Sequence, residues 1–289
     1  MPALAQAWPQ QAGHGYLKLA YGTATASEQF SFDGRRRAYA EGVNDDAFFD
    51  RSVYAYAEFG LTRQITLVGA IPFRRVFVRD AAFRYRTYGL GSATLAARVG
   101  LKPLLGWMSD ADALAATVAF TLPTGYTRNR TPSAGAGQVD AEVLLAYGRS
   151  FYPAPVYAQL SAGYRHRSAI YVLSQAVPCQ NEVDFDCFAD EQPDYEDELT
   201  ASAEIGATIA GRVLVQGLAR GVWSVRAPEM AFSVNNPFPT RQRAIKVGGG
   251  LRLHLPEDNA GLSVQAFVTP WGRNTIRSVD LFIGLDTTL

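Results

Sequence analysis

Apolar and polar side chains alternate residue by residue along most of this chain, and a helical period is hard to find anywhere in it. In the segment 245–255, Ile245 and Leu251 share one face of the expected strand. Lys246 and Arg252 share the opposite face. Similar alternating runs cover 114–122, 139–148 and 199–209. The chain is therefore expected to be all-β.

These runs are longer than the strands of most soluble proteins. Soluble strands average roughly five to six residues, whereas a tilted strand needs about 9–11 residues to cross a bilayer. In hydrocarbon every backbone amide must be paired, so strands that cross a membrane must close into a barrel without a free edge. The strand length therefore predicts a closed antiparallel transmembrane β-barrel.

Short and long connections alternate along the chain, as they do in outer-membrane barrels with short periplasmic turns and longer extracellular loops. An even number of strands would place both termini on the periplasmic side. Short turns are expected at 60–63, 102–110, 150–155, 210–212 and 256–261, and longer loops at 33–50, 78–85, 123–138, 168–195, 227–240 and 270–274. About twelve strands are expected, near 15–31, 51–60, 62–77, 87–101, 111–122, 138–149, 156–168, 197–209, 212–226, 241–255, 261–269 and 275–287.

The N-terminus carries a candidate processing signal. Ala5, Gln6 and Ala7 form an A-x-A cleavage motif, so residues 1–7 are expected to be the end of a secretory signal peptide and 8–289 a single outer-membrane barrel domain. An alanine-rich segment without this role is the alternative. Because so few residues would precede the first strand, we expect any gate in the lumen to come from the loop 123–138.

Composition limits the other partners. The chain has 27 basic and 27 acidic residues, and this balance does not predict nucleic-acid binding, which needs a basic excess. No phosphate-binding glycine loop or His/Cys ligand cluster is present in the sequence, so no cofactor or metal is predicted. The only two cysteines, Cys179 and Cys187, suit a disulfide in an oxidising compartment.

The face opposite the lipid-facing side chains is expected to line the lumen. It carries six basic and five acidic residues, and such a mixture is not an ion filter, because selectivity needs rings of one sign. The alternative is that these charges form pairs that brace the barrel. The inward aromatic residues Tyr54, Tyr56, Tyr157 and Phe267 could line a path for an aromatic solute or could only pack against one another. The predicted pore-lining residues are Tyr54, Tyr56, Glu58, Arg98, Asp140, Glu142, Arg165, Arg167, Glu204, Arg220, Lys246, Arg252 and Asp280.

Four segments together resemble a known group of outer-membrane barrels. These are EFGLTRQITLVGAIPF at 58–73, YGLGSATLAARVGL at 88–101, TLPTG at 121–125 and AYGRSF at 146–151. In their order and spacing they resemble the transporter-like family named for meta-pathway phenol degradation. The resemblance implies a channel that takes up aromatic or other hydrophobic small molecules.

We therefore expect passive uptake of a small solute, such as an aromatic or hydrophobic molecule, across a bacterial outer membrane. A first alternative is a barrel that acts as a scaffold without transport. A second is a lipid-facing enzyme similar to outer-membrane phospholipase, in which His166 would activate Ser168.

Two expected partners lie at the membrane surface. Loop arginines are candidates for the phosphates of lipopolysaccharide, because Arg recognises phosphate well. These are Arg35, Arg36, Arg37, Arg79 and Arg84. The acidic segment 182–194 has carboxylates suited to calcium, although no recognised calcium-loop spacing occurs there and a solvated loop is the simpler expectation.

Overall fold

The computed structural model describes residues 7–43, 45–81, 84–106, 108–124, 126, 132–171, 195–228, 240–255 and 259–289, apart from the side chains of 169–171. Within these residues the chain forms one antiparallel sheet of long strands and a single short 3₁₀ turn, Lys102–Leu104. None of the helical structure described there has the length and hydropathy to cross a bilayer. The prediction of an all-β fold is confirmed.

The wall of the barrel has twelve strand positions, which we call staves. Eleven are single strands, and one is built from two consecutive strands. This broken stave consists of β5 and β6, which pair one after the other with β4. A further short strand, β2, pairs with the end of β1. The strands are β1 (Gly15–Phe30), β2 (Arg36–Ala38), β3 (Phe48–Gly60), β4 (Ile65–Arg79), β5 (Arg84–Leu90), β6 (Ala93–Gly100), β7 (Asp112–Leu122), β8 (Gln138–Ser150), β9 (Val156–Tyr171), β10 (Glu198–Ile209), β11 (Val213–Ser224), β12 (Arg243–Leu255), β13 (Ala260–Arg273) and β14 (Thr275–Thr288).

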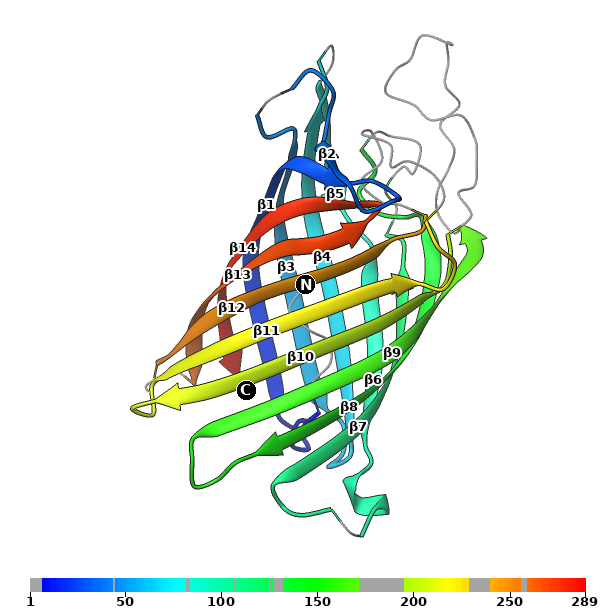
Figure 1. The fold of residues 1–289 in the computed structure, drawn as a ribbon. Coiled ribbons are helices and arrows are strands. Elements are labelled where there is room, and N and C mark those ends of the chain that lie inside the picture. The colour runs from blue at the N-terminus through cyan, green and yellow to red at the C-terminus, as the bar shows by residue number, and fades with distance from the viewer. Residues whose placement is uncertain are drawn as a thin grey trace.

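The barrel closes where the first strand meets the last. β1 pairs antiparallel with β14 from Tyr16 opposite Thr288 to Phe30 opposite Thr275. Every other stave pairs with its neighbours in the chain, so the wall is a simple meander without a free edge (Figure 1). The short turns gather at one end of the barrel, and the longer connections lie at the other. We call these the short-turn end and the long-loop end.

Two expected long loops are short in the structure. β4 and β5 continue toward each other and leave only residues 80–83 between them. β13 runs to Arg273, so Asn274 alone separates it from β14, with a positive φ of 52° that an asparagine tolerates in a tight turn. The polar residues placed in these loops continue the antiparallel ladder beyond the apolar band, where hydropathy does not distinguish strand from loop. The break between β5 and β6 and the short strand β2 were also not predicted.

Alternating burial shows which side chains face outward. Apolar residues dominate the exposed face, whereas the intervening positions are buried and often polar. Exposed aromatic residues lie toward the strand ends, where a barrel presents them to the two membrane interfaces. They include Phe59, Phe73, Tyr147, Phe151, Tyr164 and Trp223, and Trp271 stacks on Trp223 with the ring centroids 5.4 Å apart.

Candidate functional site in the barrel lumen

A fully buried ion pair lies inside the barrel near the short-turn end. The Arg98 guanidinium donates to both carboxylate oxygens of Glu58, at 3.1 and 3.2 Å, and neither side chain is exposed. Arg98 is on β6 and Glu58 on β3, so the pair spans the intervening strand β4. Tyr56 also donates to Glu58. Such a pair braces the wall, because a buried charge is stable only with a partner and with its hydrogen bonds satisfied.

A second network fills the lumen toward the long-loop end. Arg165 on β9 lies 2.9 Å from Glu142 on β8 and 2.9 Å from Glu198 on β10. Arg167 contacts Glu198 at 3.5 Å and Asp140 at 3.6 Å. Two arginines and three carboxylates therefore form one network of ion pairs, in agreement with the alternative in which the charges brace the barrel.

The remaining predicted lumen charges also contact other lumen side chains. Glu204 accepts hydrogen bonds from Tyr157, Gln159 and Gln216, the last two at 2.9 and 2.7 Å. The Arg220 guanidinium lies over the Phe267 ring, 4.6 Å from its centroid. Further pairs are Lys246 with Asp280, and Arg252 with Asp286. Tyr54 packs edge-on against Phe282 at 5.8 Å.

All the predicted pore-lining residues therefore lie on the inner face, although their part in solute passage stays a prediction. Sequence reasoning missed several side chains that share the same face. Lys18 and Tyr16 come from β1, where the alternation of apolar and polar residues is less regular. The others are Trp8, Asp50, Arg74, Glu198, Phe282 and Asp286.

The N-terminal segment lies inside the barrel, which corrects the expectation that any constriction comes from a loop alone. Ala7 is fully buried, and its backbone N–H donates to the Gln159 side chain at 3.3 Å. The Trp8 ring packs edge-on against Tyr157 with the centroids 6.0 Å apart. Gln10 donates to Glu58 at 2.9 Å. This segment, residues 7–11, narrows the lumen near the short-turn end; we call it the N-terminal segment.

Glycines on the inner wall make room for this segment. A Cβ at Gly148 would lie 2.4 Å from the Trp8 ring, and one at Gly60 would lie 2.0 Å from the Gln11 carbonyl oxygen. At Gly100 the nearest atom would be in Pro9, at 2.8 Å. Inward glycines near one end of several strands are the sequence signal that could have revealed the insertion.

The loop 123–138 also folds inward, as predicted, in the part that the structure describes. Residues 132–135 are buried, and the Tyr126 hydroxyl lies 2.8 Å from the Ser92 hydroxyl at the break between β5 and β6. The same hydroxyl accepts the N–H of Gly137 at 2.7 Å. The lumen is therefore narrowed from both ends, by this loop and by the N-terminal segment.

A cavity of about 580 Å³ lies inside the barrel beside the N-terminal segment, toward the short-turn end. Its lining combines aromatic rings with charged and amide side chains. Lys18 lines it and has no carboxylate within 4.0 Å among the described residues. The main contributors are Trp8, Tyr16, Lys18, Tyr56, Tyr157, Gln159, Glu204, Gln216, Arg220 and Arg252. Such a space can hold a small molecule that has both an apolar face and a polar group.

Replacing Gly148 with leucine is expected to displace Trp8 and raise the conductance of the barrel. The new side chain would occupy the position of the Trp8 ring, so the N-terminal segment cannot keep its place. Single-channel recording of the refolded variant checks this. Gly221→Leu is the matched control, because a Cβ there has no neighbour closer than 3.9 Å. An unchanged conductance in Gly148→Leu would contradict the placement of the segment.

The alternative catalytic pair lies at the long-loop end, on the outer face. His166 Nδ1 lies 3.1 Å from Asp197, and the Ser168 hydroxyl donates to the Val139 carbonyl oxygen at 2.6 Å. His166 thus has an acidic partner of the kind that orients a catalytic histidine. In the described part of the chain, however, no hydrogen bond joins His166 to Ser168. We therefore expect the purified protein not to hydrolyse phospholipid, even with calcium present. The Ser168→Ala variant should give the same hydrolysis rate as the wild type.

Asp197 is the centre of a small hydrogen-bond network at the long-loop end. Partial burial raises its pKa, but hydrogen bonds from Tyr164, from the Arg167 backbone N–H and from His166 outweigh that effect and lower the pKa below its usual value of 3.8. A depressed carboxyl pKa contributes stability above the unfolded-state value and loses it as the pH falls through the folded-state value.

Asp197→Asn is therefore expected to cost about 1 kcal/mol of unfolding free energy at pH 7, a modest value because the network is partly exposed. The difference from the wild type should shrink as the pH falls through the lowered pKa, and denaturant titrations between pH 7 and pH 2 would measure it. A difference that stays constant over this range would contradict this account.

Some predicted features lie outside the described residues. Cys179, Cys187 and the acidic segment 182–194 are among them, as are residues 1–6 of the expected signal peptide. The described residues contain no group of three or more His, Cys, Asp or Glu side chains able to hold a metal ion.

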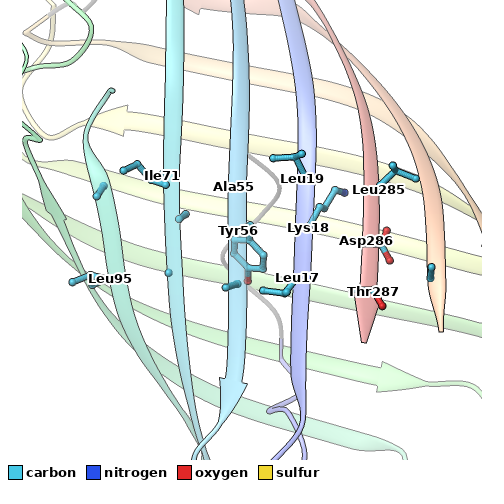
Figure 2. Close-up of a pocket in the computed structure, with 15 residues that line it drawn as sticks. Leu17, Lys18, Leu19, Ala55, Tyr56, Ile71, Leu95, Leu285, Asp286 and Thr287 are labelled. Atoms are coloured by element: carbon cyan, nitrogen blue, oxygen red, sulfur yellow. The ribbon is translucent and has the colours of Figure 1, made fainter. Parts of the chain in front are cut away.

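A second hollow lies on the outer wall. It has a volume of about 750 Å³ and is almost entirely apolar. Figure 2 shows Leu95, Ile71, Ala55, Leu19 and Leu285 side by side along it, on β6, β4, β3, β1 and β14. We call it the outer groove.

Comparisons with known proteins agree with the class that this geometry defines, a closed twelve-strand barrel of the outer-membrane type. The chain is similar to the COG4313 outer membrane channel from Pseudomonas putida F1, with a TM-score of 0.73, 14% identity and 100% of both chains covered. It is also similar to the NanC porin, with a TM-score of 0.54, 7% identity, and 94% of this chain and 100% of that chain covered. No family model and no curated protein matches the sequence.

Proposed function

We propose that this chain is an outer-membrane channel for the passive uptake of small solutes. The observation that carries the proposal is the cavity of about 580 Å³ enclosed by the barrel wall, with aromatic, amide and charged side chains on its lining. The Pseudomonas putida barrel to which the chain is similar is an outer membrane channel, which supports the proposed role.

The lining suggests the class of solute. Trp8, Tyr56 and Tyr157 offer flat apolar surfaces, and Lys18 and Gln216 offer hydrogen bonds to a polar group. We infer a small, weakly polar or aromatic molecule, the same class that the resemblance to the meta-pathway phenol-degradation family implies. Membership of that family is part of this proposal.

The proposal includes an orientation in the membrane. The short-turn end, which holds Gly15 and Leu289 hydrogen-bonded to each other, would face the periplasm, with both termini there. The long-loop end would face outward, toward lipopolysaccharide. This arrangement follows the usual distribution of turns and loops in outer-membrane barrels.

The test is single-channel recording in planar bilayers together with liposome swelling, using phenol and benzoate as probe solutes. Discrete conductance with faster swelling in these solutes is the expected result. Lys18→Gln should change the relative rates for benzoate and phenol, because it removes one positive charge from the cavity lining. A stably folded barrel that passes neither ions nor these solutes would overturn the channel proposal and favour the scaffold.

A further inference from the structure

Three arginines gather on the outer wall near the long-loop end. Arg51, Arg75 and Arg86 are exposed, while the residues that follow them in their strands, Ser52, Val76 and Thr87, are buried, so the arginines point outward. We call these three residues the arginine patch. None of these three belongs to the loop arginines that the sequence suggested for lipopolysaccharide. One of those, Arg79, already has an acidic partner, Asp45, at 3.6 Å.

The patch spans three adjacent staves. The pairing of Asp50 with Val76 and of Val53 with Phe73 places Arg51 opposite Arg75 across β3 and β4. Arg86 is opposite Phe77, and so lies diagonal to Arg75. Outward side chains at such positions are about 5 to 8 Å apart at their Cβ atoms.

Among the described residues, none supplies a counter-charge to the patch. The acidic residues of β3, Asp50 and Glu58, face the lumen, and β4 and β5 contain none. None of the three arginines forms an ion pair or side-chain hydrogen bond with another residue that the structure describes. Like charges directly opposite each other on a sheet are destabilising, so the arrangement favours an external anion.

The patch lies at the level of a membrane surface. Phe73 and Tyr88 are 48% and 73% exposed, and Tyr88 is directly opposite Arg75. Exposed aromatic residues mark the boundary of the apolar band in such barrels. The guanidinium groups are thus at the height of lipid headgroups, where Arg binds phosphate in a bidentate manner.

The outer groove begins near the membrane centre, on the same strands as the patch, and extends from there toward the short-turn end. Ala55 and Ile71, which line the groove, are each four residues from Arg51 and Arg75 in the same strands, or about 13 Å along the strand. That distance is within the half-thickness of about 15 Å for the hydrocarbon core. The lining there includes the small residues Ala55, Ala57 and Gly69, which leave room beside the larger leucine side chains.

We propose that the outer face of β3, β4 and β5 is a lipopolysaccharide site, in which Arg51, Arg75 and Arg86 bind the phosphates and the outer groove holds an acyl chain. The site depends on the proposed outer-membrane location and orientation. It does not depend on whether the lumen conducts. Lipopolysaccharide fits the patch because it combines clustered phosphates with several acyl chains in the outer leaflet.

The experiment measures binding of rough lipopolysaccharide to the refolded full chain in detergent, by microscale thermophoresis. The triple variant Arg51→Gln, Arg75→Gln and Arg86→Gln is expected to raise the apparent Kd about tenfold. Dephosphorylated lipopolysaccharide should bind the wild type with a similar loss. Arg149→Gln, an exposed arginine near the short-turn end, is the matched control and should bind like the wild type.

Other arms separate the alternatives. The proposed site would be wrong if the triple variant bound lipopolysaccharide as tightly as the wild type does. It would also be wrong if the wild type bound dephosphorylated lipopolysaccharide as tightly as intact lipopolysaccharide. If phosphatidylglycerol bound as tightly as lipopolysaccharide, the site would be one for anionic lipids in general. Gly69→Leu fills open space and should weaken binding several-fold; unchanged binding would remove the groove from the site. Heat-dependent gel migration verifies folding, and the conductance of the triple variant should equal that of the wild type, which separates this proposal from the channel proposal.

Discussion

A refolded variant that begins at Ala12 is expected to conduct several-fold more current than the full chain. The truncation removes Trp8 and Gln10 from the lumen, where they now contact Tyr157 and Glu58. Conductance depends on the narrowest part of the path, so the loss of an inserted segment has a larger effect than a change of one wall residue. Single-channel recording measures the difference.

The wall itself should survive this truncation. The strand pairings of β1 with β3 and β14 begin at Gly15 and Tyr16, beyond the deleted residues. Heat-dependent gel migration and circular dichroism would verify that the barrel still forms. If the folded, truncated barrel conducts like the full chain, the N-terminal segment is not the constriction, and the loop 123–138 becomes the better candidate.

Arg98→Ala is expected to lower the free energy of unfolding by about 3–5 kcal/mol, the largest stability effect of any single substitution proposed for this barrel. Arg98 and Glu58 are both fully buried, so the variant would leave the Glu58 carboxylate without its counter-charge. Arg98 also donates to the Trp8 carbonyl oxygen at 3.4 Å, and its loss should loosen the N-terminal segment. Urea unfolding in lipid vesicles gives the stability.

A double-mutant cycle separates the ion pair from simple loss of packing. Combining Arg98→Ala with Glu58→Ala removes both charges, so the double variant should lose much less stability than the sum of the two single variants. Additive losses would show that the two side chains do not stabilise each other. Arg149→Ala is the control. Arg149 pairs with Asp112 but its side chain is half exposed, so its loss should change the free energy of unfolding by less than about 1 kcal/mol.

The fold could be predicted because a membrane barrel has a simple local rule. Within the membrane each outward position must be apolar and each backbone amide must be paired. The position of a residue such as Leu251 in the alternating pattern therefore predicts whether it faces lipid or the lumen. The same rule identifies the inner face, and every predicted pore-lining residue lies there. It is weakest outside the hydrocarbon, which is why the ends of β4 and β13 were placed too early.

The partners of the inward residues could not be predicted in the same way. Alternation shows that Arg98 and Glu58 face inward, but not that they form a buried pair across β4. That depends on the stagger of neighbouring strands and the curvature of the wall. The same holds for His166, whose contact with Asp197 joins residues on either side of a long connection.

By itself, then, the sequence determined the barrel, a wall of about twelve strands and the face of the side chains that alternate regularly, because these follow from period-2 contacts with lipid along one strand. Only the tertiary structure decided how the lumen is filled. The entry of Trp8 into the barrel and the inward fold at Tyr126 each depend on closure, whereas the alignment of Arg51 with Arg75 depends on the register of β3 against β4. Closure brings together residues from different strands and segments in positions that no local pattern encodes.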